Sequence, residues 1–251
     1  MYPKLFGLLD TYYVIWSAAL CLMVLWTRRR ASCLYGIAAD DASDILRWTL
    51  AGVFIGAALG GYLDNWRRYA SDPVSILRFW ESGVSSGPGF IGGGLLGLYR
   101  IRKLGLSVER FAESSSLPCA FMLALGRWGC FLNGCCEGLP TDSVLGVRFP
   151  RAPDTAVWPS QLFESFAAFV IGTGLLLIEN KLRSKSEFPG NAVLFPLFLV
   201  TYGLYRIIFD RLRPGGGLFL LGAGTYSGIA AVAVGICWLV RSRGYMRRAL
   251  S

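Results

Sequence analysis

The sequence predicts an all-α fold: a polytopic membrane helix bundle of about seven transmembrane helices. Three observations predict it. Apolar and aromatic residues make up 54% of the 251 residues, whereas charged residues make up only 16%, against about 25% in soluble domains. The mean hydropathy is +0.48. Apolar runs of membrane-spanning length recur along the whole chain, so we expect residues 1–251 to form a single integral membrane domain.

The expected spans follow from length, because a helix needs about 20 largely apolar residues to cross a bilayer. The first run ends at Arg28-Arg29-Arg30 and reaches full length only if residues 5–9 contribute. The third is short and follows a glycine-rich approach. The runs are residues 12–26, 45–63, 90–99, 111–131, 162–178, 192–209 and 218–240.

The distribution of cations predicts the orientation. Most of the 25 Lys and Arg residues lie after the first, third, fifth and seventh runs, which favours N-out and C-in by the positive-inside rule. Residues 137–158, with several Pro, are then a structured outer loop. A cleaved signal peptide is disfavoured, because the cations follow the first apolar run instead of preceding it. The net charge of +9 suits a membrane surface, and we expect no nucleic-acid partner.

Arg127 is the first candidate for chemistry. It lies in a segment with four glycines, including Gly126 and Gly138, and with Asn133. An Arg at the end of a span needs protein, water or an anion beside it, and glycines let backbone N–H groups approach a ligand. Phosphate binding fits this pattern. Equally, Arg127 could extend to the membrane surface while the glycines pack helices.

A polar stripe forms the second candidate. Tyr202, Arg206, Asp210 and Arg213 fall on one helix face at intervals of three or four residues. Ionisable residues inside spans indicate function, although an Arg206–Asp210 ion pair could simply fix the helix position.

Two carboxylates are further candidates. Glu164 shares a helix face with Gln161 after Pro159, which suits a first helical turn. Glu113 lies in a serine-rich patch. Either one could instead stabilise a helix N-terminus. The glycine run 83–97, which contains Gly92 and Gly93, suggests a re-entrant or broken helix lining a cavity.

Histidine is absent and there are seven Cys. Histidine-based triads, metal ligands and proton shuttles are therefore excluded. Cys130, Cys135 and Cys136 suggest a disulfide from Cys130 to one of the other two. Their C-x4-C-C spacing, with no second pair, does not indicate a zinc site. We expect no metal ion and no cofactor.

Taken together, these segments resemble the bacterial prolipoprotein diacylglyceryl transferase family across roughly residues 45–240. The matching pieces are Gly92-Gly93-Gly94, Gly126-Arg127 with Asn133, Gly138-Leu139-Pro140, Pro159-Ser160-Gln161 with Glu164, and Tyr202-Gly203 with Arg206, Asp210 and Arg213. The chain looks like a divergent member of that family, because Trp158 and the Gly92 region stand where the family has His, and Cys130 where it has Asn.

The resemblance implies transfer of the diacylglyceryl group of phosphatidylglycerol to the lipobox Cys thiol of a preprolipoprotein, with release of glycerol phosphate, in the bacterial inner membrane. Arg127 and Arg206 would stabilise the phosphate, and Asp210 and Glu164 would orient them. Glu113, Asp210 and Tyr202 are alternatives for the thiol's base. The substrate-binding set would be Gly92, Gly93, Gly126, Asn133, Gly138, Gln161, Glu164 and Arg213.

Two other functions fit parts of the pattern. A transporter of an anionic solute would also use buried Arg and glycine-interrupted helices. A membrane thiol-redox protein would use Cys130 with Cys135 or Cys136 as an exchanging pair.

Overall fold

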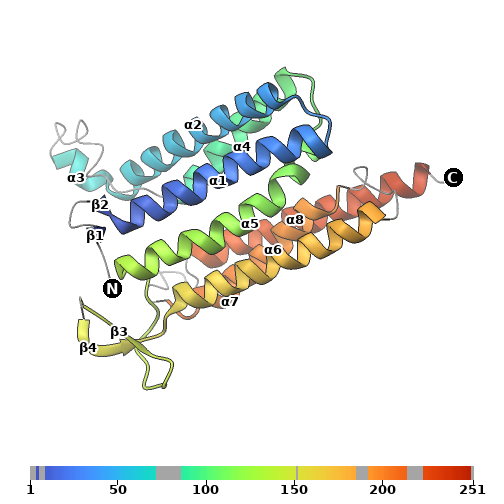
Figure 1. Cartoon of the computed structure of the whole chain (residues 1–251). Coiled ribbons are helices and arrows are strands. Elements are labelled where there is room, and N and C mark those ends of the chain that lie inside the picture. The colour runs from blue at the N-terminus through green and yellow to red at the C-terminus, as the bar shows by residue number, and fades with distance from the viewer. Residues whose placement is uncertain are drawn as a thin grey trace. The chain divides into compact units, whose positions relative to one another are not determined.

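A computed structural model describes residues 4–5, 9–71, 86–150, 152–184, 192–213 and 223–249 (Figure 1). The described chain is predominantly helical, and it divides into two compact units: residues 1–30 with 112–251, and residues 31–111. The predicted all-α membrane bundle is confirmed. The helices are α1 (Thr11–Leu34), α2 (Ala39–Asp64), the short α3 (Trp66–Ser71), α4 (Ser86–Lys103), α5 (Val108–Asn133), α6 (Ser160–Ser184), α7 (Leu194–Asp210) and α8 (Ala223–Ala249).

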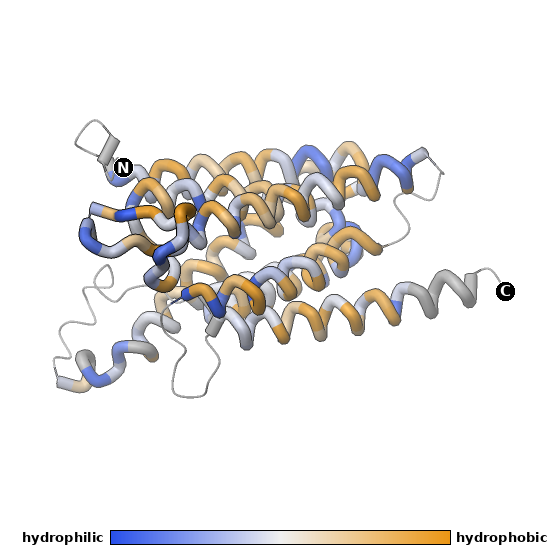
Figure 2. Tube along the Cα trace, turned by 90° about the horizontal axis from the view of Figure 1, so that it is seen from below, coloured by the Kyte–Doolittle hydropathy of each residue, from blue (hydrophilic) through white to orange (hydrophobic). Residues whose placement is uncertain are grey.

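Four of the described helices are long and apolar enough to cross a membrane by length and composition: residues 39–63, 108–133, 160–184 and 224–242. Figure 2 shows hydrophobic residues along much of the helical tubes. Large apolar side chains such as Phe54, Leu63 and Phe166 are more than two-thirds exposed, which suits contact with lipid. The count of seven spans and the N-out orientation stay predictions.

The first span differs from its expected form at both ends. Lys4–Leu5 (β1) and Leu9–Asp10 (β2) pair as antiparallel strands, so these residues do not extend the helix. The helix instead continues through Arg28-Arg29-Arg30 to Leu34. In this continuation the guanidinium of Arg30 is buried against Glu179 and the Ser114 carbonyl.

The larger unit is a helix bundle in which α6, α7 and α8 run beside one another (Figure 1). Its core joins Leu117 and Ala120 of α5, Leu175 of α6, and Leu194 and Phe198 of α7. Helix α1 packs on α5 where Trp26 meets Phe121. Because these contacts hold α5, α6 and α7 together, polar groups at the ends of the three helices converge.

Between α5 and α6 lies a short antiparallel ribbon, β3 (Val147–Phe149) and β4 (Ala152–Val157). Pro140 forms an isolated bridge to Val157. The segment expected to be a structured loop therefore contains regular backbone pairing. Its membrane side stays a prediction.

In the smaller unit α2 and α4 pack closely. Gly92 lies against the backbone of Gly52, and Gly93 against Val53. Helix α4 is continuous from Ser86, so the broken helix expected for 83–97 is not seen over 86–97, and 83–85 lie outside the described residues. The glycines permit close backbone approach, which is how small residues join helices in membranes.

Candidate active site

Three arginines converge on one carboxylate in the larger unit. Glu164, in the second turn of α6, is fully buried. Arg127 Nη2 lies 2.6 Å from its Oε2 and Arg213 Nη2 lies 2.6 Å from its Oε1. Arg206 Nη1 lies 3.5 Å from Oε2. We call Arg127, Arg206, Arg213, Glu164 and Asp210 the arginine cluster. Elements that are far apart in sequence supply it, so the fold is needed to assemble it.

Asp210 completes the cluster at the end of α7. Its Oδ1 lies 3.8 Å from Arg206 Nη2. Its Oδ2 accepts hydrogen bonds from the backbone N–H and the hydroxyl of Thr225, at 2.9 and 2.7 Å. Thr225 is in the first turn of α8, where the helix dipole favours a carboxylate. Asp210 is therefore held by two helices, and it in turn positions Arg206.

The arginine cluster carries an excess of positive charge, with three guanidinium groups against two carboxylates. Several of its buried donors also lack hydrogen-bond partners among the described residues: Arg127 Nε, Arg213 Nε and Arg213 Nη2. Arg213 Nη2 is close to Glu164 Oε1 but is not directed along a hydrogen bond to it. Buried guanidinium groups with unused N–H donors are suited to an anion such as phosphate.

Two tyrosines of α7 border the cluster. Tyr202 and Tyr205 both interact electrostatically with Arg127, Glu164 and Arg206. Their rings meet edge to face at 5.2 Å. The Tyr205 hydroxyl is buried without a partner among the described residues, so it is a further group available to a ligand.

Three other predicted binding residues, Gln161, Asn133 and Gly138, make contacts with the segment between α5 and α6. Gln161, one turn before Glu164, is fully buried and donates from Nε2 to the Cys135 carbonyl at 2.7 Å. Its Oε1 has no partner among the described residues. Asn133 is the last residue of α5 and interacts with Cys135. Gly138 donates its N–H to the Trp158 carbonyl at 2.8 Å, and a Cβ there would collide with Trp158 and the Leu212 carbonyl.

Gly126 packs between helices in the structure, which is one of the two roles that the sequence left open for the glycines of this segment. It lies inside the continuous helix α5, so its N–H belongs to the helical hydrogen-bond pattern. A Cβ at this position would meet the Trp16 ring at 2.6–2.7 Å. Gly126 therefore makes room for the indole of α1. Gly92 and Gly93 belong to the smaller unit, where they pack on α2 as described above.

Glu113 is not part of the arginine cluster. Its two carboxylate oxygens accept the backbone N–H groups of Leu194 and Phe195, at 3.0 and 2.8 Å. These are the first residues of α7, where N–H groups have no intrahelical partner. Fourteen residues along α5 from Arg127, Glu113 is about 21 Å away at the helical rise. The geometry gives it a capping role.

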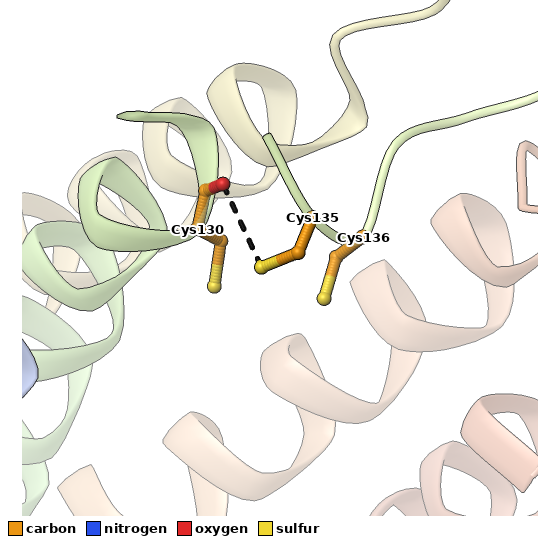
Figure 3. A group of neighbouring side chains, drawn as sticks. All are labelled: Cys130, Cys135 and Cys136. Carbon is orange, nitrogen blue, oxygen red and sulfur yellow. Dashed lines mark hydrogen bonds between the residues drawn. The ribbon is translucent and has the colours of Figure 1, made fainter. Parts of the chain in front are cut away.

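The three cysteines gather beside Arg127. Cys130 is in the last turn of α5, and Cys135 and Cys136 follow that helix directly (Figure 3). All three are free thiols, and their Sγ atoms lie within 4.8 Å of one another. Cys135 Sγ also donates to the Cys130 carbonyl at 3.7 Å. The sequence suggested a disulfide from Cys130 to one of the other two, and the three cysteines do lie close together, but they are free thiols in the structure.

Fold and site together define a class: a polytopic α-helical membrane protein with a buried cluster of three arginines and two carboxylates. A model of the prolipoprotein diacylglyceryl transferase family matches residues 5–241. The chain belongs to this family, and it is therefore a transferase.

Relatives from several bacteria support the assignment. The chain is 34% identical to a phosphatidylglycerol–prolipoprotein diacylglyceryl transferase of Geobacter sulfurreducens, over 79% of this chain and 76% of the relative. It is 34% identical to the protein of that name from Azospirillum brasilense, over 80% and 77%, and 31% identical to that of Cupriavidus pinatubonensis, over 96% and 89%. The family predicted from the motifs is thus confirmed, and it favours the transferase over the transporter and the redox protein.

Sequence reasoning missed two groups at the site. Tyr205 precedes Arg206, and its position one turn after Tyr202 could have suggested it. Thr225, which holds Asp210, had no signal in the sequence, because its role depends on how α8 packs on α7.

Proposed function

We propose that this protein transfers the diacylglyceryl group of phosphatidylglycerol to the lipobox Cys thiol of a preprolipoprotein, releasing glycerol phosphate. Family membership supports the reaction class, and the relatives' names supply the two substrates. The observation that carries the proposal is the convergence of Arg127, Arg206 and Arg213 on Glu164 in a buried site.

The arginines would act on the phosphate. In this reaction the acceptor sulfur attacks a glyceryl carbon, and the bond from that carbon to a phosphate oxygen breaks. Negative charge grows on the departing phosphate, and pre-positioned guanidinium groups stabilise such charge strongly where water is excluded. The Nε atoms of Arg127 and Arg213, which are buried without hydrogen-bond partners among the described residues, are the donors we assign to this task.

The carboxylates would position those arginines. Glu164 contacts all three guanidinium groups. Its negative charge offsets their mutual repulsion and would hold them close together before substrate binds. Asp210, held by Thr225, restrains Arg206. The Tyr202 hydroxyl remains available to a substrate hydroxyl or to the acceptor thiol. Of the three groups considered for the base, Tyr202 and Asp210 lie at the arginine cluster and Glu113 does not.

The site belongs to the bacterial cytoplasmic (inner) membrane in this proposal. Both the phospholipid and the lipobox segment would reach it from within the bilayer, since each is membrane-anchored. The apolar, exposed faces of the helices suit that environment.

The test is direct. The purified full-length protein is incubated with phosphatidylglycerol vesicles and a lipobox peptide, and the peptide is analysed by mass spectrometry. We expect the peptide Cys to gain one diacylglyceryl group in the wild type and not with Arg213→Ala. The matched control is Arg47→Ala, since that guanidinium is 75% exposed and pairs only with nearby Asp44 among the described contacts. Absence of any mass gain with wild type would overturn the proposal.

A further inference from the structure

The three free thiols form a pre-arranged ligand set. The Sγ atoms of Cys130, Cys135 and Cys136 all lie within 4.8 Å of one another, and Figure 3 shows the side chains gathered in one place. A tetrahedral zinc ion with Zn–S bonds of about 2.3 Å needs sulfurs about 3.8 Å apart. Small side-chain rotations would therefore bring all three sulfurs to a common ion.

The backbone around the thiols is fixed by the rest of the unit. The Cys135 carbonyl accepts Gln161 Nε2 at 2.7 Å, and the Cys136 carbonyl accepts Ser160 Oγ at 2.8 Å. Cys135 N–H donates to the Cys130 carbonyl at 3.1 Å. Ser160 and Gln161 are both fully buried. Because these bonds position the cysteine backbone, little ordering remains when a ligand binds.

We propose that Cys130, Cys135 and Cys136 bind a zinc ion through three sulfurs and leave its fourth position open. Thiolates prefer soft or borderline cations such as zinc. Among the described residues no further His, Cys, Asp or Glu joins the group, and zinc sites with three protein ligands keep a position for water or substrate. Three thiolates and Zn²⁺ carry one net negative charge, and the nearest guanidinium along α5 is that of Arg127, one turn before Cys130.

The open position would take the acceptor thiol, an assignment that rests on the proposed function. The chain has no His to remove the thiol proton, and coordination to zinc ionises a thiol without a neighbouring base. The zinc site also adjoins the arginine cluster: Cys130 follows Arg127 by three residues on α5, and Gln161, bonded to Cys135, precedes Glu164 by three residues on α6.

The step balances without a redox partner. The acceptor thiol displaces water from zinc and its proton passes to solvent. The sulfur then forms a bond to the glyceryl carbon, and the carbon–oxygen bond to phosphate breaks. The electron pair leaves with the phosphate oxygen, held by Arg127, Arg206 and Arg213. The thioether product is a weaker zinc ligand than a thiolate, so water replaces it.

Metal content tests the site itself. The full-length protein is purified under a phosphine reductant, dialysed against Zn²⁺ and analysed by elemental mass spectrometry, with Cd²⁺ titration followed through thiolate charge-transfer absorbance. We expect one equivalent per chain, lost in Cys135→Ser and Cys136→Ser. The control is Cys33→Ser with Cys237→Ser, which removes exposed thiols outside the group.

X-ray absorption of the wild-type zinc protein should report three sulfur ligands, a result that does not depend on how the variants fold. The proposed zinc site would be refuted by much less than one zinc ion per chain. It would also be refuted if Cys130 and Cys135 form a disulfide even when the reductant is present.

A second experiment separates the role of zinc from the transferase itself. Adding a lipobox peptide to the Cd²⁺-loaded protein should raise the number of sulfur ligands from three to four, and a Cys→Ser peptide should not. Full transfer by protein stripped of metal would refute the role of zinc while leaving the transferase intact. A zinc protein that binds the peptide sulfur but never transfers lipid would refute the transferase while leaving the site intact.

Discussion

Arg30 and Glu179 form a buried bidentate ion pair, with Nη1 and Nη2 at 2.9 and 3.1 Å from the two carboxylate oxygens. Arg30 Nε also donates to the Ser114 carbonyl at 3.0 Å. The pair therefore joins α1, α5 and α6. Glu179 lies fifteen residues along α6 from Glu164, about 22 Å by the helical rise, so these helices carry a polar cluster toward each end.

Breaking this pair should destabilise the protein. Arg30→Met leaves the Glu179 charge buried and unpaired, a change that costs about 3–5 kcal/mol. The double variant Arg30→Met/Glu179→Met should recover much of that, since apolar replacement of a whole buried pair is often neutral. Unfolding in detergent micelles measures both. Single variants within about 1 kcal/mol of wild type would contradict a structural role for the pair.

The geometry of the arginines should matter as much as their charge. Arg127→Lys and Arg213→Lys retain the charge but lose the planar fork and the Nε donors. We expect transfer to fall about 10²–10³-fold, the usual loss when a donor to developing negative charge is removed. Initial rates of peptide lipidation measure this. Arg47→Lys provides the exposed control, and equal rates for all three variants would show that charge alone suffices.

Glu113 should affect stability and not chemistry. Glu113→Gln removes the charge from the carboxylate that accepts two N–H groups at the start of α7. Losing a helix cap costs about 0.5–2 kcal/mol, so the unfolding midpoint should fall. Transfer per folded molecule should stay at the wild-type rate. A large loss of rate in well-folded Glu113→Gln would restore it as a candidate base.

A methyl group beside Asp210 should disturb the arginine cluster. A Cβ at Gly224 would overlap Asp210 Oδ1 and Arg206 Nη2, whereas one at Gly174 would meet nothing within 4 Å. Gly224→Ala is therefore expected to lower transfer at least about tenfold, since such misplacement costs up to about 10²-fold. Gly174→Ala should match the wild type. Similar rates in the two variants would show that Asp210 and Arg206 adapt freely.

The helices were predictable from sequence because lipid imposes a length and an apolar composition on them. Expected and observed ranges agree closely for α5 and α7, whereas α1 runs eight residues past Trp26. The extension was not predictable, because three consecutive arginines look like a membrane boundary until Arg30 is seen to meet Glu179, 149 positions away.

The candidate site was predictable in part. Arg127, Glu164, Arg206, Asp210 and Arg213 were named from spacing and resemblance, and the structure brings them together. Glycine motifs were less informative, since Gly126 accommodates Trp16 and Gly92 contacts Gly52. A glycine's role depends on what packs against it, and sequence spacing does not contain that information.

The imbalance of three guanidinium groups over two carboxylates also sets which membrane lipids would compete at the site. A zwitterionic headgroup brings an ammonium next to its phosphate, and that ammonium would be repelled by the surplus cation while adding desolvation cost. Zwitterionic lipids would then bind the site weakly and compete little with the substrate. The transfer rate would depend on the fraction of anionic lipid in the leaflet.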